Sequence, residues 1–306
     1  MLSDRVLKMK RIVECVPNFS EGRRAEVVDR IVKAMAAARD IKVLDIKADI
    51  DHNRSVVTLV GPPETITDAA FAGIAKAAEL IDLNKHVGEH PRMGAADVVP
   101  FVPVRGVTMD DCAALARALG RRVGEELRIP VFLYEAAATR PDRRNLAEVR
   151  KGQFEGLKEL IGKDPSRKPD YGPEKIHPTA GAVAIGAREF LIAFNVNLAS
   201  PNLALAKEIA KKVRESSGGM PCVKAIGLML NNLNVAQVSM NLTNYKVTPM
   251  RKAFDAIKAE AEKAGEKIRN SELIGLAPQA AIGAGDVEYL KMENFDPRQI
   301  IENRLD

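Results

Sequence analysis

The densest group of polar residues in this sequence is the run Lys85–Gly94, which holds two of the chain's four histidines, His86 and His90. The run lies between a predicted helix and a predicted strand, where catalytic loops are common. An unperturbed imidazole titrates near pH ~6.5, so a histidine here could accept and return a proton at working pH. In an extended chain alternate side chains share a face, which would place His90 beside the cation Arg92. The competing interpretation is a histidine that only ties down its loop by hydrogen bonds.

The same run also fits a metal-site pattern. His86, Glu89 and His90 match H-x-x-E-H, the motif of inverted zinc proteases. That motif needs a helix, on which both histidines share one face. Gly88 weakens a helix, and Pro91 biases the residue before it away from helical geometry. We therefore keep a zinc hydrolase as a remote alternative and expect no metal site.

A second polar segment, Asp49–Arg54, could hold a cation through its carboxylates and His52. It lacks the ligand spacing and the glycine of a calcium loop, so a hairpin turn is the favoured interpretation. Arg54 opens the strand that follows, and arginine is suited to bidentate contact with a carboxylate.

The sequence has no Gly-x-Gly-x-x-Gly after a strand and no phosphate-binding P-loop, so nothing in it favours a nucleotide-binding enzyme.

Strand and helix patterns occur in the same order in both halves of the chain. In the first half we expect strand Arg11–Val16, helix Arg24–Ala38, strands Val43–Ile46 and Ser55–Val60, helix Glu64–Leu83 and strand Val98–Val104. In the second half we expect strand Glu189–Leu198, helix Asn202–Arg214, strands Val223–Leu230 and Val235–Leu242, helix Met250–Ile268 and strand Leu273–Pro278. Each half reads βαββαβ, which predicts an α/β (α+β) protein made of two ferredoxin-like layers. That topology hosts many functions and assigns none by itself.

An insertion separates the two halves. It contains a predicted helix over Thr108–Leu127, a short strand over Val131–Tyr134 and a helix over Asn145–Ile161. The segment Lys163–Gly181 that follows is rich in proline, glycine and charge, a composition that favours a linker. We therefore expect two subdomains, residues 1–184 and residues 185–306, with His90 in the first.

Composition limits the classes of function. The 46 basic and 41 acidic residues give a net charge of +5, and the basic residues form no stripe with stacking aromatics of the kind nucleic-acid binders show. No run reaches the roughly 18 apolar residues of a membrane span, and Asp4 and Arg5 interrupt any secretory signal. The three cysteines, Cys15, Cys112 and Cys222, are far apart in sequence, which suits a reducing compartment. We expect a cytoplasmic protein that binds neither nucleic acid nor membranes.

Several long segments, taken together, resemble one known family, the glutamate formiminotransferases. The segments are Ile12–Gly22, Asn53–Val56, Val60–Glu64, Gly88–Ala95, Pro100–Val107, Phe190–Leu198 and Ala236–Leu242. One of them contains Gly-Glu-His-Pro-Arg-Met-Gly, the motif around the family's catalytic histidine, which is His90 here. The segments keep the family's order, and the resemblance covers nearly the whole chain.

The resemblance implies an activity and a set of site residues. The expected reaction is transfer of a formimino group from N-formimino-L-glutamate to N5 of tetrahydrofolate, a metal-independent step of histidine catabolism and one-carbon metabolism. His90 would act as general base and acid, and we expect Asn53, Arg54, Glu89 and Arg92 to bind substrate. The family's folate-contacting stretch falls on Gly172, Pro173, Glu174, Lys175, Ile176, His177, Pro178, Thr179, Ala180 and Gly181. That assignment replaces the linker interpretation for this part of the chain.

The resemblance also implies an architecture and partners. It predicts two βαββαβ subdomains with a ligand groove between them, and a homodimer. Animal relatives carry a cyclodeaminase domain after this one, so a separate cyclodeaminase is an expected partner. Two alternatives within folate chemistry stay open at this point: an enzyme that processes 5-formyltetrahydrofolate, and a non-catalytic folate-binding protein.

Overall fold

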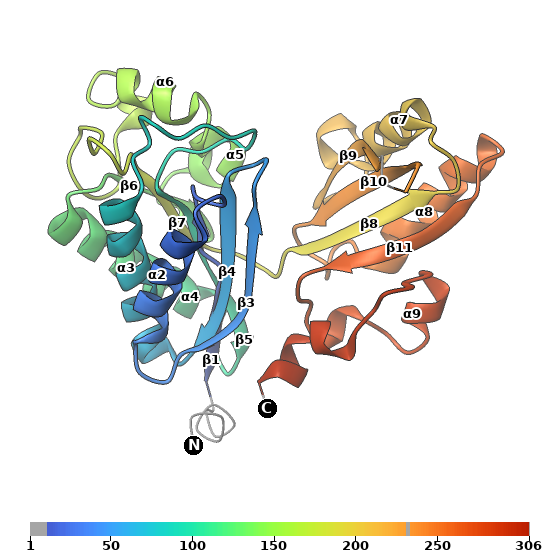
Figure 1. Ribbon diagram of the computed structural model, residues 1–306, viewed down its shortest axis with the longest axis horizontal. Coiled ribbons are helices and arrows are strands. Elements are labelled where there is room, and N and C mark those ends of the chain that lie inside the picture. The colour runs from blue at the N-terminus through green and yellow to red at the C-terminus, as the bar shows by residue number, and fades with distance from the viewer. Residues whose placement is uncertain (1–10, 231–232, 306) are drawn as a thin grey trace. The chain divides into compact units, whose positions relative to one another are not determined.

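The computed structural model describes residues 11–230 and 233–305, and the chain divides into two compact units, Met1–Arg188 and Glu189–Asp306 (Figure 1). Each unit has its own sheet, its own helices and its own apolar core. This confirms the predicted mixed α/β class with two βαββαβ units. The charged N-terminal residues that argue against a secretory signal lie outside the described residues.

The first unit forms one mixed sheet. Its elements are β1 (Ile12–Cys15), β2 (Asn18–Phe19), α2 (Ala25–Ala36), β3 (Lys42–Asp49), β4 (Arg54–Gly61), α3 (Pro63–Leu80), β5 (Ala96–Arg105), α4 (Met109–Arg122), β6 (Val131–Glu135), α5 (Leu146–Val149), α6 (Gln153–Leu160) and β7 (Val183–Ala187). Strand β1 lies between β4 and β5, and β3 pairs with β4, all antiparallel, as in a ferredoxin-like layer. Strand β7, which the sequence patterns did not predict, pairs parallel with both β5 and β6 and extends this sheet.

Regular apolar spacing explains how the helices cover this sheet. Helix α2 buries Val27, Ile31 and Met35, which lie on one face of a helix, and it packs beside α3 (Figure 1). Helix α4 begins at a capping box, in which Asp111 N donates to Thr108 Oγ1 over 3.1 Å and Thr108 N donates to Asp111 Oδ2 over 2.9 Å.

One helix prediction in the first unit was wrong. The expected continuous helix Asn145–Ile161 is two short helices, α5 and α6, because the chain between them turns through Gly152 at φ +87°. That left-handed conformation cannot continue a right-handed helix. The break lies against the loop between α3 and β5, since Phe154 N donates to the Arg92 carbonyl over 2.9 Å.

The second unit is a complete βαββαβ layer. Its elements are β8 (Ile192–Leu198), α7 (Leu203–Val213), β9 (Val223–Leu230), β10 (Val235–Leu242), α8 (Met250–Lys263), β11 (Ile268–Ile274) and α9 (Asp286–Tyr289). The strand order is β11-β8-β10-β9 and every pairing is antiparallel. Helices α7 and α8 pack against each other and against the sheet.

The end of this layer differs from the prediction. Helix α8 ends at Lys263 rather than Ile268, because Gly265 N donates to Glu262 O and Glu266 N donates to Ala261 O, the pattern of a Schellman cap. The last strand therefore starts earlier than the predicted Leu273–Pro278. In its first half the buried residues Ile268 and Ser271 lie three positions apart, across a register shift in the pairing with β8, and this helix-like spacing explains why the segment could be mistaken for a helix end.

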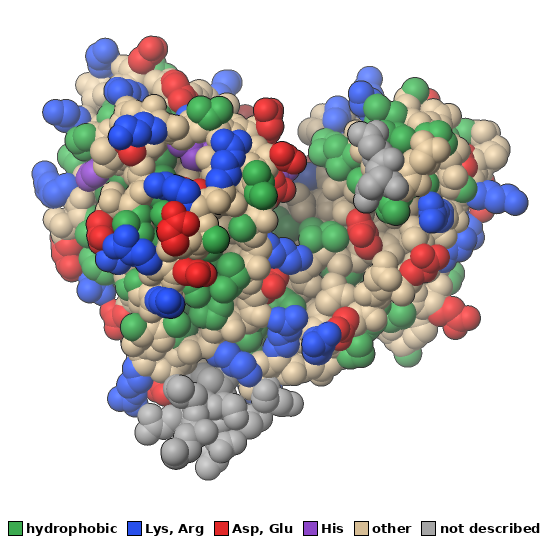
Figure 2. Space-filling model, viewed as in Figure 1, with side chains coloured by type: hydrophobic (Ala, Val, Ile, Leu, Met, Phe, Trp, Pro, Cys, Tyr) green, Lys and Arg blue, Asp and Glu red, His purple; other side chains and the backbone are tan. Residues whose placement is uncertain are grey.

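No helix in the described part of the chain has the length and apolar character needed to cross a membrane. On the face seen in Figure 2, Lys and Arg side chains alternate with Asp and Glu and do not form a continuous basic stripe. This distribution agrees with the small net charge of +5.

Candidate active site in the first unit

The loop between α3 and β5, which carries His90, contains no helix. His86, Glu89 and His90 therefore cannot share a helical face, and the H-x-x-E-H pattern does not form the zinc site of an inverted protease. Within residues 11–230 and 233–305, no three His, Cys, Asp or Glu side chains are grouped so that they could hold a metal ion. The geometry here gives the zinc hydrolase no support.

The hydrogen bond of His90 fixes the tautomer of its ring. Nδ1 lies 2.7 Å from the Pro91 carbonyl oxygen, which can only accept, so Nδ1 carries the proton. Nε2 is then the atom that can accept a proton. Partial burial of the ring, together with the nearby charge of Arg54, lowers the pKa of His90 to about 4. The imidazole is therefore neutral at working pH, the form a general base requires.

Asp97, the second residue of β5, organises the charges around His90. It is fully buried and accepts hydrogen bonds from Arg54 Nη1 and from Met93 N, each over 2.8 Å. Arg150 Nη2 lies 2.8 Å from the same oxygen that pairs with Arg54. Burial is the largest single effect and raises the pKa of Asp97, but the two arginines and the Met93 amide together outweigh it, and the net direction is downward. One carboxylate is thus shared by two guanidinium groups, and this cluster has a net charge of +1.

A network of amide hydrogen bonds holds Arg54 and the His90 loop in place. Asn18 Oδ1 accepts from Arg54 Nη2 over 2.9 Å and from Arg54 Nε over 3.2 Å. Asn53 Oδ1 accepts from Gly22 N over 3.0 Å, and Asn53 Nδ2 donates to the Val87 carbonyl over 3.1 Å. Asn53 therefore connects the β3–β4 turn to the loop that carries the catalytic candidate.

The predicted hairpin over residues 49–54 is present, and it brings a second imidazole to the site. His52 lies in the turn between β3 and β4, with its ring centroid 6.0 Å from that of His90 and the ring planes at 76°. Its Nδ1 is 2.9 Å from Asp49 Oδ2. The segment thus supplies a neighbour to His90, although its spacing predicted only a turn.

Arg92 and Glu89 have different surroundings from Arg54. Arg92 makes a bidentate contact with Glu155 of α6, over 2.8 Å and 2.6 Å, and its Nε donates to His86 Nδ1 over 3.2 Å. Glu89 is exposed, and its backbone N donates to the Asp51 carbonyl over 3.3 Å. His90 Nδ1 is satisfied by a backbone carbonyl rather than by the Glu89 carboxylate.

The stretch Gly172–Gly181 is tied to the end of the His90 loop. Ala95 N donates to the Ala180 carbonyl and Ala182 N donates to the Met93 carbonyl, each over 2.9 Å. The two backbone segments lie so close together that a Cβ at Gly94 would be 1.8 Å from the Ala182 carbonyl oxygen, so only glycine fits there. The catalytic candidate and the stretch expected to contact folate are therefore joined by backbone hydrogen bonds within one unit.

Comparison with known proteins identifies the family. The family model described as formiminotransferase domain, N-terminal subdomain, matches residues 12–188, and the model described as formiminotransferase domain matches residues 193–303. The chain belongs to the formiminotransferase family.

Curated relatives cover this chain almost from end to end. The glutamate formimidoyltransferase of Streptococcus pyogenes serotype M1 is 50% identical over 298 residues, which is 97% of this chain and 99% of the relative. The glutamate formimidoyltransferase of Thermoplasma acidophilum is 49% identical over 96% of this chain and 97% of its own length. The formimidoyltransferase-cyclodeaminase of Rattus norvegicus is 44% identical over 90% of this chain, and the match covers 51% of that longer relative.

Three residues of this candidate site were not predicted from the sequence: Asn18, Asp97 and Arg150. Asp97 had a usable signal, because it is an acidic residue inside the otherwise apolar run that forms β5. Arg150 had none, because its position depends on the break between α5 and α6 that the helical pattern conceals.

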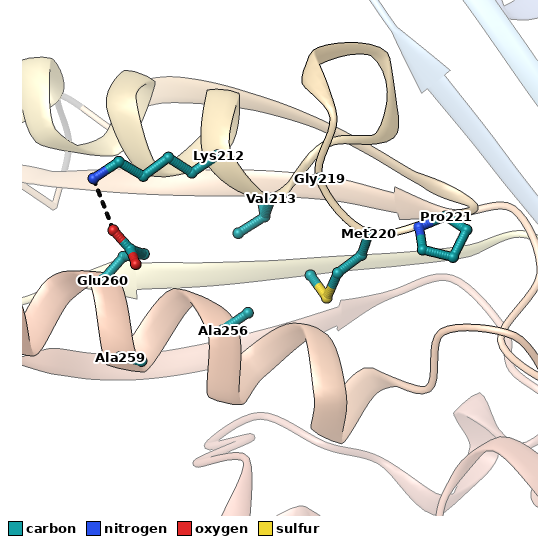
Figure 3. A pocket seen from close by; sticks show the side chains of 8 residues that line it. All are labelled: Lys212, Val213, Gly219, Met220, Pro221, Ala256, Ala259 and Glu260. Atoms are coloured by element: carbon teal, nitrogen blue, oxygen red, sulfur yellow. Dashed lines mark hydrogen bonds and ion pairs between the residues drawn. The ribbon is translucent and has the colours of Figure 1, made fainter.

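A separate cavity lies in the second unit of this formiminotransferase. It has a volume of about 410 Å³ and lies between α7 and α8, with the Lys212–Glu260 ion pair, 2.7 Å between Nζ and Oε2, at its wall (Figure 3). Its other walls are mostly small or apolar, including Val213, Met220 and Ala256. The residues that line the cavity include no histidine, and its two charged side chains, Lys212 and Glu260, pair with each other.

Proposed function

We propose that this protein is a glutamate formimidoyltransferase, a one-carbon group transferase that moves the formimino group of N-formimino-L-glutamate to N5 of tetrahydrofolate and releases L-glutamate. The observation that carries this proposal is the 50% identity, over nearly the full length of both chains, to a relative named for that activity. The neutral, partly buried His90 beside a cationic cluster supplies chemistry that fits it.

His90 has the properties that the proton transfers of this reaction need. As N5 of tetrahydrofolate attacks the formimino carbon, Nε2 of His90 accepts the proton that N5 loses. The same nitrogen then returns the proton to the glutamate nitrogen as the carbon–nitrogen bond to glutamate breaks. No covalent bond to the protein is required, and the alignment of two substrates in one site supplies much of the acceleration.

The remaining site residues are proposed to hold the two substrates. We assign substrate contacts to Asn53, Arg54, Glu89 and Arg92, and folate contacts to the stretch Gly172–Gly181. Support for the second assignment comes from the backbone hydrogen bonds that join this stretch to Met93 and Ala95, directly after the His90 loop. Arg54 and Arg92 are the cations of the set, and carboxylates are the anions on both substrates.

The wider setting follows from the same family assignment. Tetrahydrofolate is the proposed co-substrate, and no step of the mechanism requires a metal ion. We propose a cytoplasmic homodimer acting in histidine catabolism, with a separate cyclodeaminase as the partner that consumes the product. The fusion of both activities in relatives such as the rat protein, named formimidoyltransferase-cyclodeaminase, supports a link between the two steps.

A transfer assay with formimino-glutamate, and separately with 5-formyltetrahydrofolate, tests the proposal. Purified protein is given tetrahydrofolate with formimino-glutamate, and the 5-formimino product is followed after conversion to the methenyl form in acid. We expect one glutamate to be released for each 5-formimino product formed. Treatment with a chelator should leave the rate unchanged. Absence of transfer, with turnover or tight binding of 5-formyltetrahydrofolate instead, would replace this function by another within folate chemistry.

A further inference from the structure

Arg150 is the least satisfied cation of the Asp97 cluster. It follows α5 directly, at the break that separates α5 from α6. A guanidinium has five N–H donors. Among the described residues, the Arg150 side chain has one acceptor, Asp97 Oδ2, and its Nε is buried with no hydrogen-bond partner. An unpaired buried donor costs stability, so fold stability alone does not account for this side chain.

The charge balance of the cluster points to an anion. Arg54 and Arg150 share the single carboxylate of Asp97, and this leaves one positive charge without an anionic partner in the cluster. Arg54 is held on two sides, by Asp97 and by Asn18. Arg150 is held on one side only, and 17% of its side chain is exposed. Its exposed donors can therefore turn to a ligand without losing another hydrogen bond.

Arg92, the other cation near the loop, is already committed. Both of its terminal nitrogens contact the Glu155 carboxylate, in a bidentate geometry that uses the fork of the guanidinium. A substrate carboxylate would have to displace Glu155 to reach Arg92. At Arg150 it would displace no acidic side chain, because Asp97 remains paired with Arg54 and Met93 N.

We propose that Arg150 binds a carboxylate of a substrate next to His90, and that Asp97 positions it for this contact. The inference rests on the proposed function, because N-formimino-glutamate and the glutamate tail of folate both present carboxylates. It names a specificity-determining residue outside the set Asn53, Arg54, Glu89 and Arg92.

Binding of an anion at this point would also tune the base. The charged and titratable groups that act on His90 are Arg54 and Arg150, which lower its pKa, and Asp97, which raises it; the His52 ring lies 6.0 Å away. A carboxylate bound to Arg150 offsets part of the positive field. The pKa of His90 then rises toward the working pH, where a general base is most effective. The substrate would thus improve the base that acts on it.

Three variants test the proposal. Arg150→Met removes the charge with little loss of volume, Arg150→Lys keeps the charge but loses the fork, and Arg144→Met removes an exposed arginine from the same segment as a control. For Arg150→Met we expect the KM of one substrate to rise about tenfold or more, as for loss of a charge-assisted hydrogen bond. We expect Arg150→Lys to recover part of that loss and Arg144→Met to behave as wild type.

The two substrates are distinguished by which KM moves. A rise confined to formimino-glutamate assigns the donor's carboxylate to Arg150, and a rise confined to tetrahydrofolate assigns the folate tail. Unchanged KM values for both substrates in a folded Arg150→Met variant would overturn the proposal.

A binding measurement separates this inference from the proposed function. L-glutamate and 5-formyltetrahydrofolate are titrated into wild-type protein while the ring resonances of His90 are followed by NMR. We expect an upward shift of the His90 pKa on binding in the wild type and a smaller shift in Arg150→Met. If the wild type transfers no formimino group but shows this shift, the anion site stands and the function fails. If transfer occurs and the shift is the same in Arg150→Met, the anion site fails and the function stands.

Discussion

Asp97 and Asp170 are both nearly buried aspartates that pair with arginine, and both lie in the first unit, yet their surroundings differ in charge. Asp170 pairs with one arginine, Arg143, and both side chains are less than 10% exposed, at 7% and 4%. Asp170 also accepts from Leu133 N over 2.8 Å and from the Thr139 hydroxyl. Asp97, at 0% exposure, pairs with two arginines. The first pair is neutral, and the second cluster carries a positive charge.

The donors of the arginines differ in the same way. Arg143 Nη2 donates to the carbonyls of Ser166 and Lys168, and the guanidinium lies 4.9 Å from the centre of the Phe132 ring. Arg150 keeps a buried Nε without a partner. Burial is therefore shared by the Asp170 pair and by the Asp97 cluster of the candidate site. Excess charge and an unpaired donor beside a histidine distinguish the second from the first.

The largest expected effect is on the structural side of this comparison. Arg143→Met leaves Asp170 as a buried anion without a cation, so we expect the free energy of unfolding to fall by about 3 kcal/mol or more. The folded fraction should keep wild-type KM values, because Arg143 takes no part in the Asp97 cluster. Urea unfolding followed by circular dichroism, with KM measured on the same sample, checks both parts. A changed KM with an unchanged free energy of unfolding would contradict the distinction between the Asp170 pair and the Asp97 cluster.

His90→Ala should give the opposite pattern. We expect turnover to fall about a hundredfold or more, because the proton relay is lost, while the affinity for folate stays near that of wild type. Stability should change little, since the ring is only partly buried and its hydrogen bond is to the adjacent residue Pro91. Single-turnover kinetics and a folate titration measure the two quantities. Near-normal turnover in a well-folded variant would remove His90 from the mechanism.

These two sites also show how much the sequence could predict. The alternation of apolar residues predicted both βαββαβ layers, and a long resemblance pointed to His90 before any geometry was known. Strand β7 (Val183–Ala187) was missed because it is short, is buried on both faces and follows a segment rich in proline and glycine. Such a strand has no alternation to read.

The partners of Asp97 were missed for a different reason. Arg54, Asp97 and Arg150 come from three distant parts of the chain, and only the fold brings them together. Arg150 lies in a segment whose pattern predicted one continuous helix, which would have directed its side chain elsewhere. Propensity and spacing report on neighbours along the chain, whereas shared charge depends on tertiary contacts.

The third expectation concerns the pKa of His90, which burial and Arg54 lower to about 4, against an ordinary value near ~6.5. The unfolded chain takes up a proton between these two pH values and the folded chain does not. The free energy of unfolding should therefore fall as the pH is lowered through this window. Above the window, His90 should make no contribution to the pH dependence of stability. His90→Asn should remove this part of the slope, which unfolding at several pH values can measure. An NMR titration of His90 near pH ~6.5 in the free protein would contradict the proposed field of Arg54 and Arg150.

The smallest effects come from the neutral residues that support each aspartate, and they give the finest test of the comparison. Asn18→Ala removes the acceptor of two Arg54 donors, and Thr139→Val removes one hydroxyl from Asp170. Each should cost about 1 kcal/mol in unfolding free energy. Only Asn18→Ala should also raise a substrate KM, by a fewfold, because Arg54 is then positioned by Asp97 alone. Equal kinetic effects of the two variants would mean that Asn18 supports the fold and not the geometry of the site, and the Asp97 cluster would then differ from the Asp170 pair in charge but not in preorganisation.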